Sequence, residues 1–196
     1  MTETPPTVAC PACGTQNPAG SRFCNSCGAT LEAPPAPAAE TRKTVTVLFI
    51  DATSSTALGE RLDPESLRAV MTRYFDVMRE VIEFHGGSVE KFIGDAVMAV
   101  FGVPVVHEDD ALRACRAALE IHVQLGQLDE AIRAERGASV EWRIGINTGE
   151  VVAGDAAAGQ RIVTGDAVNV AARLEAAAAP GEILLGAETY ELIRNE

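Results

Sequence analysis

The segment Glu90–Phe101 restricts the possible folds of this chain more than any other stretch of its sequence. Two short apolar runs in this segment flank Gly94 and Asp95, and a Gly-Asp pair in this setting predicts a tight β-hairpin. Another apolar run, Val45–Ile50, predicts a strand that ends directly before Asp51. Both acidic residues are therefore expected at strand ends, where two carboxylates can bind a divalent cation if the fold brings them together.

The order of the other predicted elements indicates how the strands pair. Apolar spacing and turn residues predict a strand at about 44–50, a helix at 63–85, the hairpin at 89–101, a helix at about 108–136 and a strand at 140–147. This β-α-β-β-α-β order predicts an α+β fold with a ferredoxin-like sheet. A right-handed crossover makes the first two strands parallel, with the third strand between them. The end of the first strand, at Asp51, is therefore expected beside the hairpin tip, at Asp95.

The rest of the sequence predicts shorter elements and the buried faces of the helices. We expect strands at 151–153, 161–163 and 182–185, and helices at about 166–178 and 187–194. In the helix predicted for 108–136, the spacing places four side chains on the inner face: Leu112, Cys115, Leu119 and Val123. Cys115 is interpreted as a small buried hydrophobic residue of this face.

Four of the five cysteines occur near the N-terminus as two Cys-x-x-Cys pairs, namely Cys10, Cys13, Cys24 and Cys27. Glycine follows each pair and allows a tight turn, and the spacing predicts four thiolates around one tetrahedral zinc ion. Two disulfides are the alternative, but they fit a secreted protein, and Met1–Val8 lacks the pattern of a secretory signal. The segment 8–29 resembles the zinc ribbons at the front of many multidomain bacterial proteins, which often bind protein partners. A structural zinc is expected here.

A change of composition after the cysteines marks a domain boundary. Residues 30–41 are rich in alanine and proline, which predicts an extended linker, and a larger domain is expected at 42–196. The net charge of −12 argues against a nucleic-acid partner, because phosphate contacts need clustered lysine and arginine. No apolar run is long enough for a membrane span, so we expect no membrane association and a cytoplasmic location.

Residues 42–196 resemble the class III nucleotidyl cyclases, which make cyclic AMP or cyclic GMP. The resemblance rests on four segments that occur in order and at suitable spacing, namely Phe49–Thr53, Lys91–Asp95, Arg143–Gly149 and Gly165–Arg173. It implies that the chain is an enzyme, a lyase that converts ATP into 3′,5′-cyclic AMP and pyrophosphate in intracellular signalling. The family usually has further strands and a phosphate-binding lysine after the last helix seen here, so we expect the domain to be incomplete at its C-terminal end.

The resemblance also implies a two-metal site. Asp51 and Asp95 are expected to bind two Mg²⁺ or Mn²⁺ ions, with the backbone carbonyl of Ala52 as an additional ligand. Hard cations prefer such oxygen ligands and take substrate phosphates as the rest of their coordination shell. One ion would activate the ribose 3′-hydroxyl, and the other would stabilise the departing pyrophosphate.

Further residues are expected to contact the nucleotide. Asn169 and Arg173 are four positions apart, so they project from one face of a helix. The resemblance implies that Asn169 orients the ribose and that Arg173 stabilises charge on the α-phosphate in the transition state. It also implies that Arg143 reaches the triphosphate. The backbone between Thr53 and Thr56 is a candidate cradle for phosphate oxygens.

Two positions bear on the choice of base. Lys91 matches the lysine that reads adenine in this family, where guanylyl cyclases usually carry glutamate, and it favours ATP. The second base-reading position, commonly Asp or Thr in adenylyl cyclases, falls on Ile162, which cannot hydrogen-bond the adenine amino group. The loss of such a contact costs about 1–3 kcal/mol in discrimination. Thr164 lies two positions further along the predicted strand, on the same face.

The resemblance implies a homodimer with two shared active sites, because the metal-binding aspartates and the group of Lys91, Asn169 and Arg173 come from opposite subunits. Two alternatives stay open. In one, a degenerate or regulatory cyclase domain binds nucleotide without turnover and controls a downstream region, as Ile162 suggests. In the other, the zinc ribbon recruits a protein partner and the cyclase fold is a scaffold. Retention of both aspartates and of Arg173 favours the enzyme, because a scaffold needs none of them.

Overall fold

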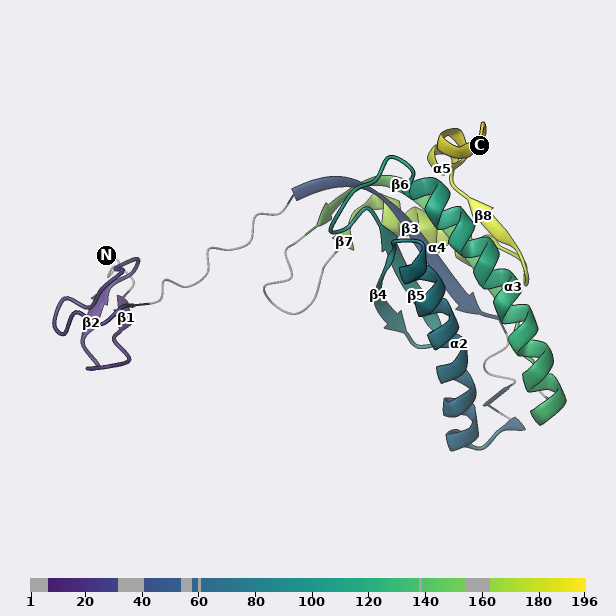
Figure 1. Ribbon diagram of the computed structural model, residues 1–196, viewed down its shortest axis with the longest axis horizontal. Coiled ribbons are helices and arrows are strands. Elements are labelled where there is room, and N and C mark those ends of the chain that lie inside the picture. The colour runs from purple at the N-terminus through teal and green to yellow at the C-terminus, as the bar shows by residue number, and fades with distance from the viewer. Residues whose placement is uncertain (1–6, 32–40, 54–57, 60, 138, 154–162) are drawn as a thin grey trace, which may run out of the picture. The chain divides into compact units, whose positions relative to one another are not determined.

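The computed structural model describes residues 7–31, 41–53, 58–59, 61–137, 139–153 and 163–196 of the chain. These residues belong to two compact units, Met1–Ala39 and Glu40–Glu196, which are considered separately below (Figure 1). Among the helices of the described ranges, none is long and apolar enough to cross a membrane.

The first unit is a small β-structure with very little core. Strand β1 (Thr7–Ala9) pairs antiparallel with β2 (Gln16–Pro18), and a further bridge joins Phe23 to Thr30. Among the described residues of this unit, the buried apolar cluster comprises Cys10, Cys24 and Leu31, with Val8 and Ala29 packed against it. Units with so small a core are commonly stabilised by disulfides or by a metal ion.

The second unit is built on one sheet with the strand order β4-β5-β3-β6-β7, and β8 pairs in parallel with β6. The strands are β3 (Thr41–Ala52), β4 (Ser88–Ile93), β5 (Ala96–Phe101), β6 (Trp142–Ala153), β7 (Val163–Thr164) and β8 (Ile183–Leu185). Both β3 and β4 are antiparallel to β5, which lies between them. The predicted α+β, ferredoxin-like arrangement of the first strands is therefore confirmed.

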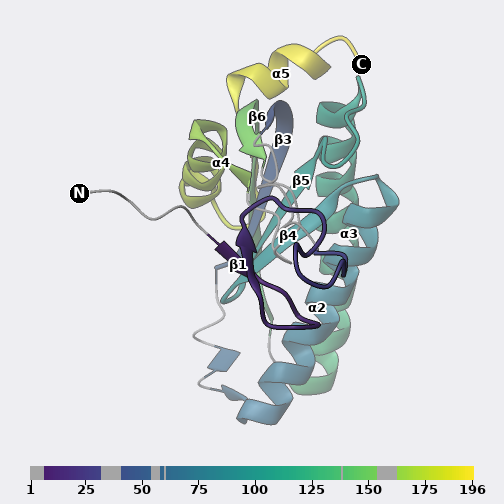
Figure 2. The same ribbon diagram turned by 90° about the vertical axis from the view of Figure 1, so that its left-hand side faces the viewer.

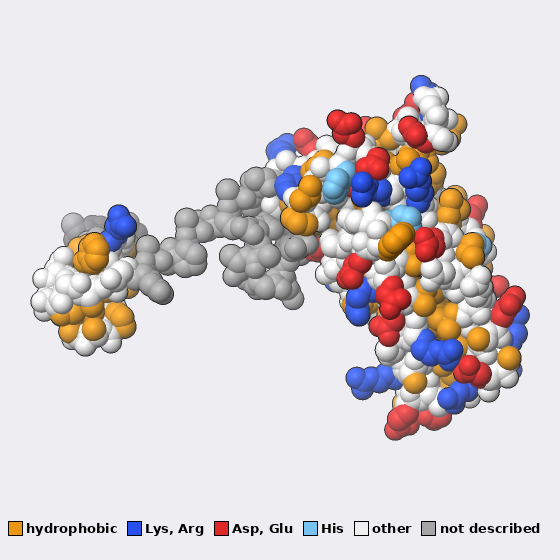
Figure 3. All heavy atoms as spheres, viewed as in Figure 1, with side chains coloured by type: hydrophobic (Ala, Val, Ile, Leu, Met, Phe, Trp, Pro, Cys, Tyr) orange, Lys and Arg blue, Asp and Glu red, His pale blue; other side chains and the backbone are white. Residues whose placement is uncertain are grey.

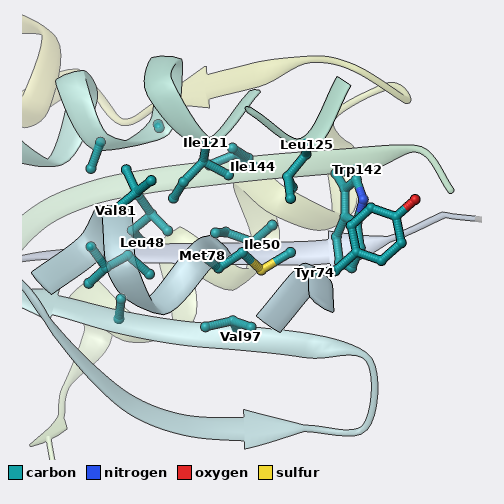
Figure 4. Packing of buried hydrophobic residues seen from close by; sticks show 14 of the residues in the cluster. Leu48, Ile50, Tyr74, Met78, Val81, Val97, Ile121, Leu125, Trp142 and Ile144 are labelled. Carbon is teal, nitrogen blue, oxygen red and sulfur yellow. The ribbon is translucent and has the colours of Figure 1, made fainter. Parts of the chain in front are cut away.

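Helices cover both faces of this sheet. The helices are α2 (Pro64–Phe84), α3 (Asp110–Arg136), α4 (Asp166–Ala177) and α5 (Ala187–Ile193). Helices α2 and α3 pack on one face, and α4 packs on the other (Figure 2). Side chains of the first layer, among them Leu48, Met78 and Ile121, interdigitate between the sheet and the two helices (Figure 4). On the side drawn in Figure 3, acidic and basic side chains of this unit are interspersed.

Helix α2 begins as its sequence predicts. The Asp63 side chain caps the helix by accepting a 2.9 Å hydrogen bond from the Ser66 backbone N–H, and Pro64 occupies the first turn. The hydroxyl of Tyr74, on the buried face, donates to Asp129 of α3 at 3.0 Å. The predicted amphipathic pattern therefore places one face of α2 in the core.

The predicted inner face of α3 is wrong in part. Leu119 and Val123 are 60% and 57% exposed, whereas Ala114, Ala118 and Ile121 are fully buried. Small alanine side chains let the helix backbone approach the sheet and α2 closely, and the larger leucine and valine are left on the outside. The spacing of large apolar residues therefore predicted the wrong side of α3, because the buried side consists largely of alanine.

Strand β6 also differs from its prediction. Two separate strands were expected at 140–147 and 151–153, but β6 runs without a break from Trp142 to Ala153. It pairs with β3 along twelve consecutive residues, and Thr148 shares a 2.9 Å hydroxyl hydrogen bond with Thr46 of β3. Gly149 lies within this strand, and its lack of a side chain leaves room for the Cβ of Ala167 in α4.

Candidate functional site

The fold brings the ends of β3 and of the β4–β5 hairpin together. Ile50 pairs with Val97 of β5, so Asp51 lies next to the hairpin tip. The tip is a two-residue loop of Gly94 and Asp95, in which Gly94 has a φ of +64°, a conformation that glycine adopts without strain. The predicted juxtaposition of the two strand ends is therefore present.

Asp51 contacts a cation of the protein itself. Arg143 lies opposite Asp51 in the β3–β6 register, and its Nη2 donates to Oδ2 of Asp51 at 2.8 Å. The Nη1 of the same guanidinium donates to the backbone carbonyl of Ala176 in α4 at 3.2 Å. The hydrogen bond to Asp51 raises the pKa of Arg143 above its usual value. Arg143, predicted to reach the triphosphate, is thus held at the predicted metal site.

Glu175 completes this cluster and was missed by the sequence analysis. Its Oε1 lies 2.6 Å from Nε of Arg143, as an ion pair without the direction of a hydrogen bond. Burial raises the pKa of the Glu175 carboxyl, and Arg143 opposes this effect. The sequence contained a signal for it. Glu175 follows Ala167 and Ala171 at intervals of four on the buried side of α4, where an acidic residue needs a partner.

Asn169 and Arg173 occupy the opposite side of α4. Both are exposed, whereas Ala167, Ala171 and Glu175 face the sheet. Arg173 lines a shallow surface hollow together with Val170, Leu174, Ala176 and Ala177. The predicted common face of Asn169 and Arg173 is therefore open to a ligand or to another protein surface.

Two glycines of β6 determine how closely α4 approaches the sheet. A Cβ on Gly145 would overlap the backbone of Ala171 and Glu175. A Cβ on Gly149 would lie 2.9 Å from the Cβ of Ala167. These glycines allow the helix backbone to rest on the strand, which brings Glu175 to Arg143.

The remaining predicted nucleotide contacts lie in different places. Lys91 is exposed on β4, three positions before Gly94. The backbone N–H and the hydroxyl of Thr53 both bond to the Glu141 carbonyl, at 2.9 Å and 3.1 Å. Ala52 is buried at the end of β3. Thr56 and Ile162 lie outside the described residues.

The first unit gathers its four paired cysteines into one cluster. The Sγ atoms of Cys10, Cys13, Cys24 and Cys27 all lie within 4.8 Å of one another, and both the Cys10–Cys27 and Cys13–Cys24 pairs are 3.6 Å apart. Thiolates around a tetrahedral zinc have nearly this separation. Backbone N–H groups of Cys27 and Ser26 lower the pKa of Cys24 to about 6, whereas the neighbouring Cys13 and Cys10 side chains raise the pKa of Cys27. The donor set fits zinc.

Asn17 supports this cluster from within the unit. It is fully buried, and its Nδ2 donates to Sγ of Cys24 at 3.6 Å and to the Thr15 carbonyl at 2.8 Å. Its Oδ1 accepts a 2.9 Å hydrogen bond from the Asn25 backbone N–H. One side chain therefore connects the β1–β2 turn to the second cysteine pair.

We expect the Asn17→Ala variant to bind zinc about 10-fold more weakly, because groups that orient metal ligands typically contribute this much. Competition with a chromophoric chelator measures the zinc affinity. Asn25→Ala is the matched control, since it removes an exposed amide and keeps the backbone N–H that bonds to Asn17. Equal zinc affinities of Asn17→Ala and the wild type would contradict a supporting role for Asn17.

Comparison with known proteins places both units in families. The profile of the adenylate and guanylate cyclase catalytic domain matches residues 38–196, and a zinc-ribbon domain profile matches residues 10–31. The chain therefore belongs to the adenylate and guanylate cyclase catalytic domain family, with a zinc ribbon preceding the cyclase domain.

Individual curated relatives include adenylate cyclases. Adenylate cyclase 1 of Rhizobium meliloti is 38% identical over 137 residues, which are 68% of this chain and 21% of that protein. An adenylate cyclase of Mycobacterium tuberculosis is 33% identical over 152 residues, which are 76% of this chain and 33% of that protein. The chain thus spans a fifth to a third of the length of these relatives.

Solved structures share the fold at similar identity. The adenylyl cyclase CyaB of P. aeruginosa superposes with a TM-score of 0.76 at 35% identity, covering 80% of this chain and 83% of that one. The guanylyl cyclase Cya2 gives a TM-score of 0.74 at 34% identity, covering 78% and 79%. The fold is therefore that of a nucleotidyl cyclase, and these neighbours include enzymes for both bases.

Proposed function

We propose that this chain is an adenylyl cyclase that converts ATP into 3′,5′-cyclic AMP and pyrophosphate in intracellular signalling. The observation that carries the proposal is that the end of β3, with Asp51, lies next to the tip of the β4–β5 hairpin, with Asp95, in a chain of the cyclase family. Retention of Asn169 and Arg173 on the exposed side of α4 supports turnover. A domain that served only as a scaffold would need none of these side chains.

The donor set at the strand ends fits two hard divalent cations. Asp51 and Asp95 supply carboxylate oxygens, and Ala52 supplies a backbone carbonyl, which are the ligand types that Mg²⁺ and Mn²⁺ prefer. Asp51 already holds a cation, the guanidinium of Arg143, at 2.8 Å. When bound, the ions would activate the ribose 3′-hydroxyl and stabilise the pyrophosphate leaving group.

The arginines and Asn169 would act on the nucleotide directly. Arg143 lies at the metal site and would donate to the triphosphate once metal binds to Asp51. Asn169 would orient the ribose, and Arg173 would donate to the α-phosphate as the 3′-oxygen attacks and the bond to pyrophosphate breaks. The backbone between Thr53 and Thr56 would contact phosphate oxygens at the end of β3.

The site would be completed by a second copy of the chain. Asn169 and Arg173 lie on the exposed side of α4, while Asp51 and Arg143 lie at the sheet and contact its buried side. The metal-binding group and the transition-state group would therefore come from opposite subunits of a homodimer, giving two equivalent sites. We further propose a cytoplasmic protein in which the zinc ribbon, at 8–29 ahead of a linker at 30–41, binds a protein partner.

The choice of ATP rests on Lys91, an exposed cation that would donate to the adenine ring. We expect the purified chain to form cyclic AMP from ATP with Mn²⁺, and to form less cyclic GMP from GTP. The Lys91→Glu variant is expected to lower the ratio of kcat/KM for ATP to that for GTP by about 30-fold, because a carboxylate cannot donate the hydrogen bond that adenine accepts. Chromatographic quantification of both cyclic nucleotides measures this ratio.

Lys43→Glu is the matched control, since it makes the same change of charge on β3, where Lys43 donates to the Pro104 carbonyl instead. An unchanged base ratio in Lys91→Glu would contradict the role of Lys91. A wild type that prefers GTP would overturn the choice of base and retain the cyclase reaction. A dimeric wild type without any product would favour a degenerate domain that binds nucleotide, as the loss of a polar group at Ile162 suggests.

A further inference from the structure

Glu175 is a buried charged residue to which the proposed function assigns no role. Its side chain is 11% exposed and lies on the sheet side of α4, whereas Asn169 and Arg173 lie on the other side. Burial of a carboxylate is costly unless a cation accompanies it. The cation here is Arg143, whose Nε lies 2.6 Å from Oε1 of Glu175.

All three nitrogens of the Arg143 guanidinium have a partner, and the partners come from two elements. Asp51 of β3 accepts from Nη2, whereas Glu175 and the Ala176 carbonyl, both of α4, contact Nε and Nη1. A planar guanidinium held along two edges has a fixed orientation. Arg143 therefore connects the predicted metal ligand Asp51 to the helix that carries Arg173.

A divalent cation at Asp51 would compete with Arg143 for the same carboxylate. The ion takes up the negative charge of this carboxylate and repels the guanidinium, so the contact between Arg143 and Asp51 weakens. The contacts to α4 involve the other two nitrogens of the guanidinium, Nε and Nη1. The Glu175 carboxylate, 2.6 Å from Nε, then remains beside Arg143 as a counter-charge.

We propose that Glu175 is a positioning residue that retains Arg143 at the active site while Asp51 passes from the guanidinium to the metal. Glu175 acts through Arg143 and does not bind the metal. Its negative charge lowers the cost of separating Arg143 from Asp51, and its place on α4 keeps the guanidinium directed at the position of the triphosphate. This inference rests on the proposed function, because the metal at Asp51 is part of that function.

The test measures binding of Mn²⁺ alone, by water-proton relaxation, to the full chain without nucleotide. We expect Glu175→Gln to weaken Mn²⁺ binding about 10-fold, because losing the Glu175 charge strengthens the pair between Arg143 and Asp51, which the metal must break. Glu120→Gln is the matched control, since it makes the same substitution in a carboxylate of α3. Glu120 pairs with His85 at 2.8 Å. The Mn²⁺ affinity of this variant is expected to stay within about twofold of the wild type, as is usual for a surface charge far from the ion.

A second background tests whether Glu175 acts through Arg143. In Arg143→Met, where no guanidinium competes for Asp51, adding Glu175→Gln is expected to change the Mn²⁺ affinity by less than about threefold, since coupled residues are not additive. Glu175→Asp keeps the charge but moves it back by one methylene. We expect its Mn²⁺ affinity to fall by about threefold, between the wild type and Glu175→Gln. Thermal unfolding of each variant is measured alongside.

Several outcomes would overturn the proposal. An unchanged Mn²⁺ affinity in Glu175→Gln would show that Glu175 does not influence the exchange at Asp51. An equal loss in the Arg143→Met background would show that Glu175 acts directly on the metal, and an equal loss in Glu120→Gln would show a general effect of charge or stability. Failure of the proposed function gives a different result, because the wild type would then bind Mn²⁺ but form no cyclic nucleotide.

Discussion

The Asp95→Ala variant is expected to form cyclic nucleotide about 1000-fold more slowly than the wild type, because the loss of a metal ligand removes about 4 kcal/mol of transition-state stabilisation. Asp95 lies in the two-residue loop between β4 and β5, and β5 pairs with β3, which carries Asp51 near its end. The hairpin conformation depends on Gly94, which keeps its positive φ in the variant. Initial rates with Mn²⁺ and ATP measure the effect.

Measuring Mn²⁺ binding together with thermal unfolding distinguishes loss of the metal site from loss of the fold in Asp95→Ala. The midpoint of thermal unfolding of Asp95→Ala is expected to stay close to that of the wild type, while Mn²⁺ binding falls in parallel with the rate. Asp76→Ala is the matched control, because it removes a carboxylate of α2 that is 54% exposed and pairs only loosely with Arg79, at 3.6 Å. A variant without Asp95 that retained both Mn²⁺ binding and the wild-type rate would exclude Asp95 from the metal site.

The Gly145→Ala variant is expected to lower the free energy of unfolding by about 3 kcal/mol, the upper part of the usual range for overpacking. The added methyl group would overlap the backbone of Ala171 and Glu175, and a helix backbone cannot move aside as a flexible side chain can. Trp142 is the only tryptophan of the chain and lies buried on the same strand, so its fluorescence reports urea unfolding of this unit.

Gly126→Ala provides the contrast within the same protein. Gly126 lies in α3, and a Cβ there would meet no atom within 4 Å. This variant is expected to gain up to about 1 kcal/mol, because alanine favours the helix over glycine. If Gly145→Ala were as stable as the wild type, the close approach of α4 to β6 would not depend on this glycine.

A displaced α4 would also affect the site. Glu175 lies on the helix that Gly145 admits, and its contact with Arg143 at 2.6 Å depends on that approach. We therefore expect Gly145→Ala to lower the cyclase activity even under conditions where the variant is fully folded. The glycines of the Arg143–Gly149 segment thus have a packing role that their sequence pattern alone does not reveal.

The prediction of α3 shows where periodicity is insufficient. Large apolar residues indicated a face with Leu119 and Val123, but the buried face is formed by small residues such as Ala114 and Ala118. Alanine is compatible with buried and exposed positions alike, so its pattern does not identify a face. Only the neighbouring helix α2 and the sheet determine which side of α3 can approach them.

Local patterns were sufficient to predict how the first three strands pair, the approach of Asp51 to the hairpin tip and the zinc ribbon. These features depend on local preferences, namely apolar spacing, turn residues, the handedness of crossovers and the spacing of cysteines. The partners of Arg143, in contrast, could be identified only from the folded chain. Asp51 precedes Arg143 by 92 positions. Glu175 contacts Arg143 from α4, which packs closely on β6 at Gly145. Such contacts depend on the register and the distance between packed elements, which no local pattern encodes.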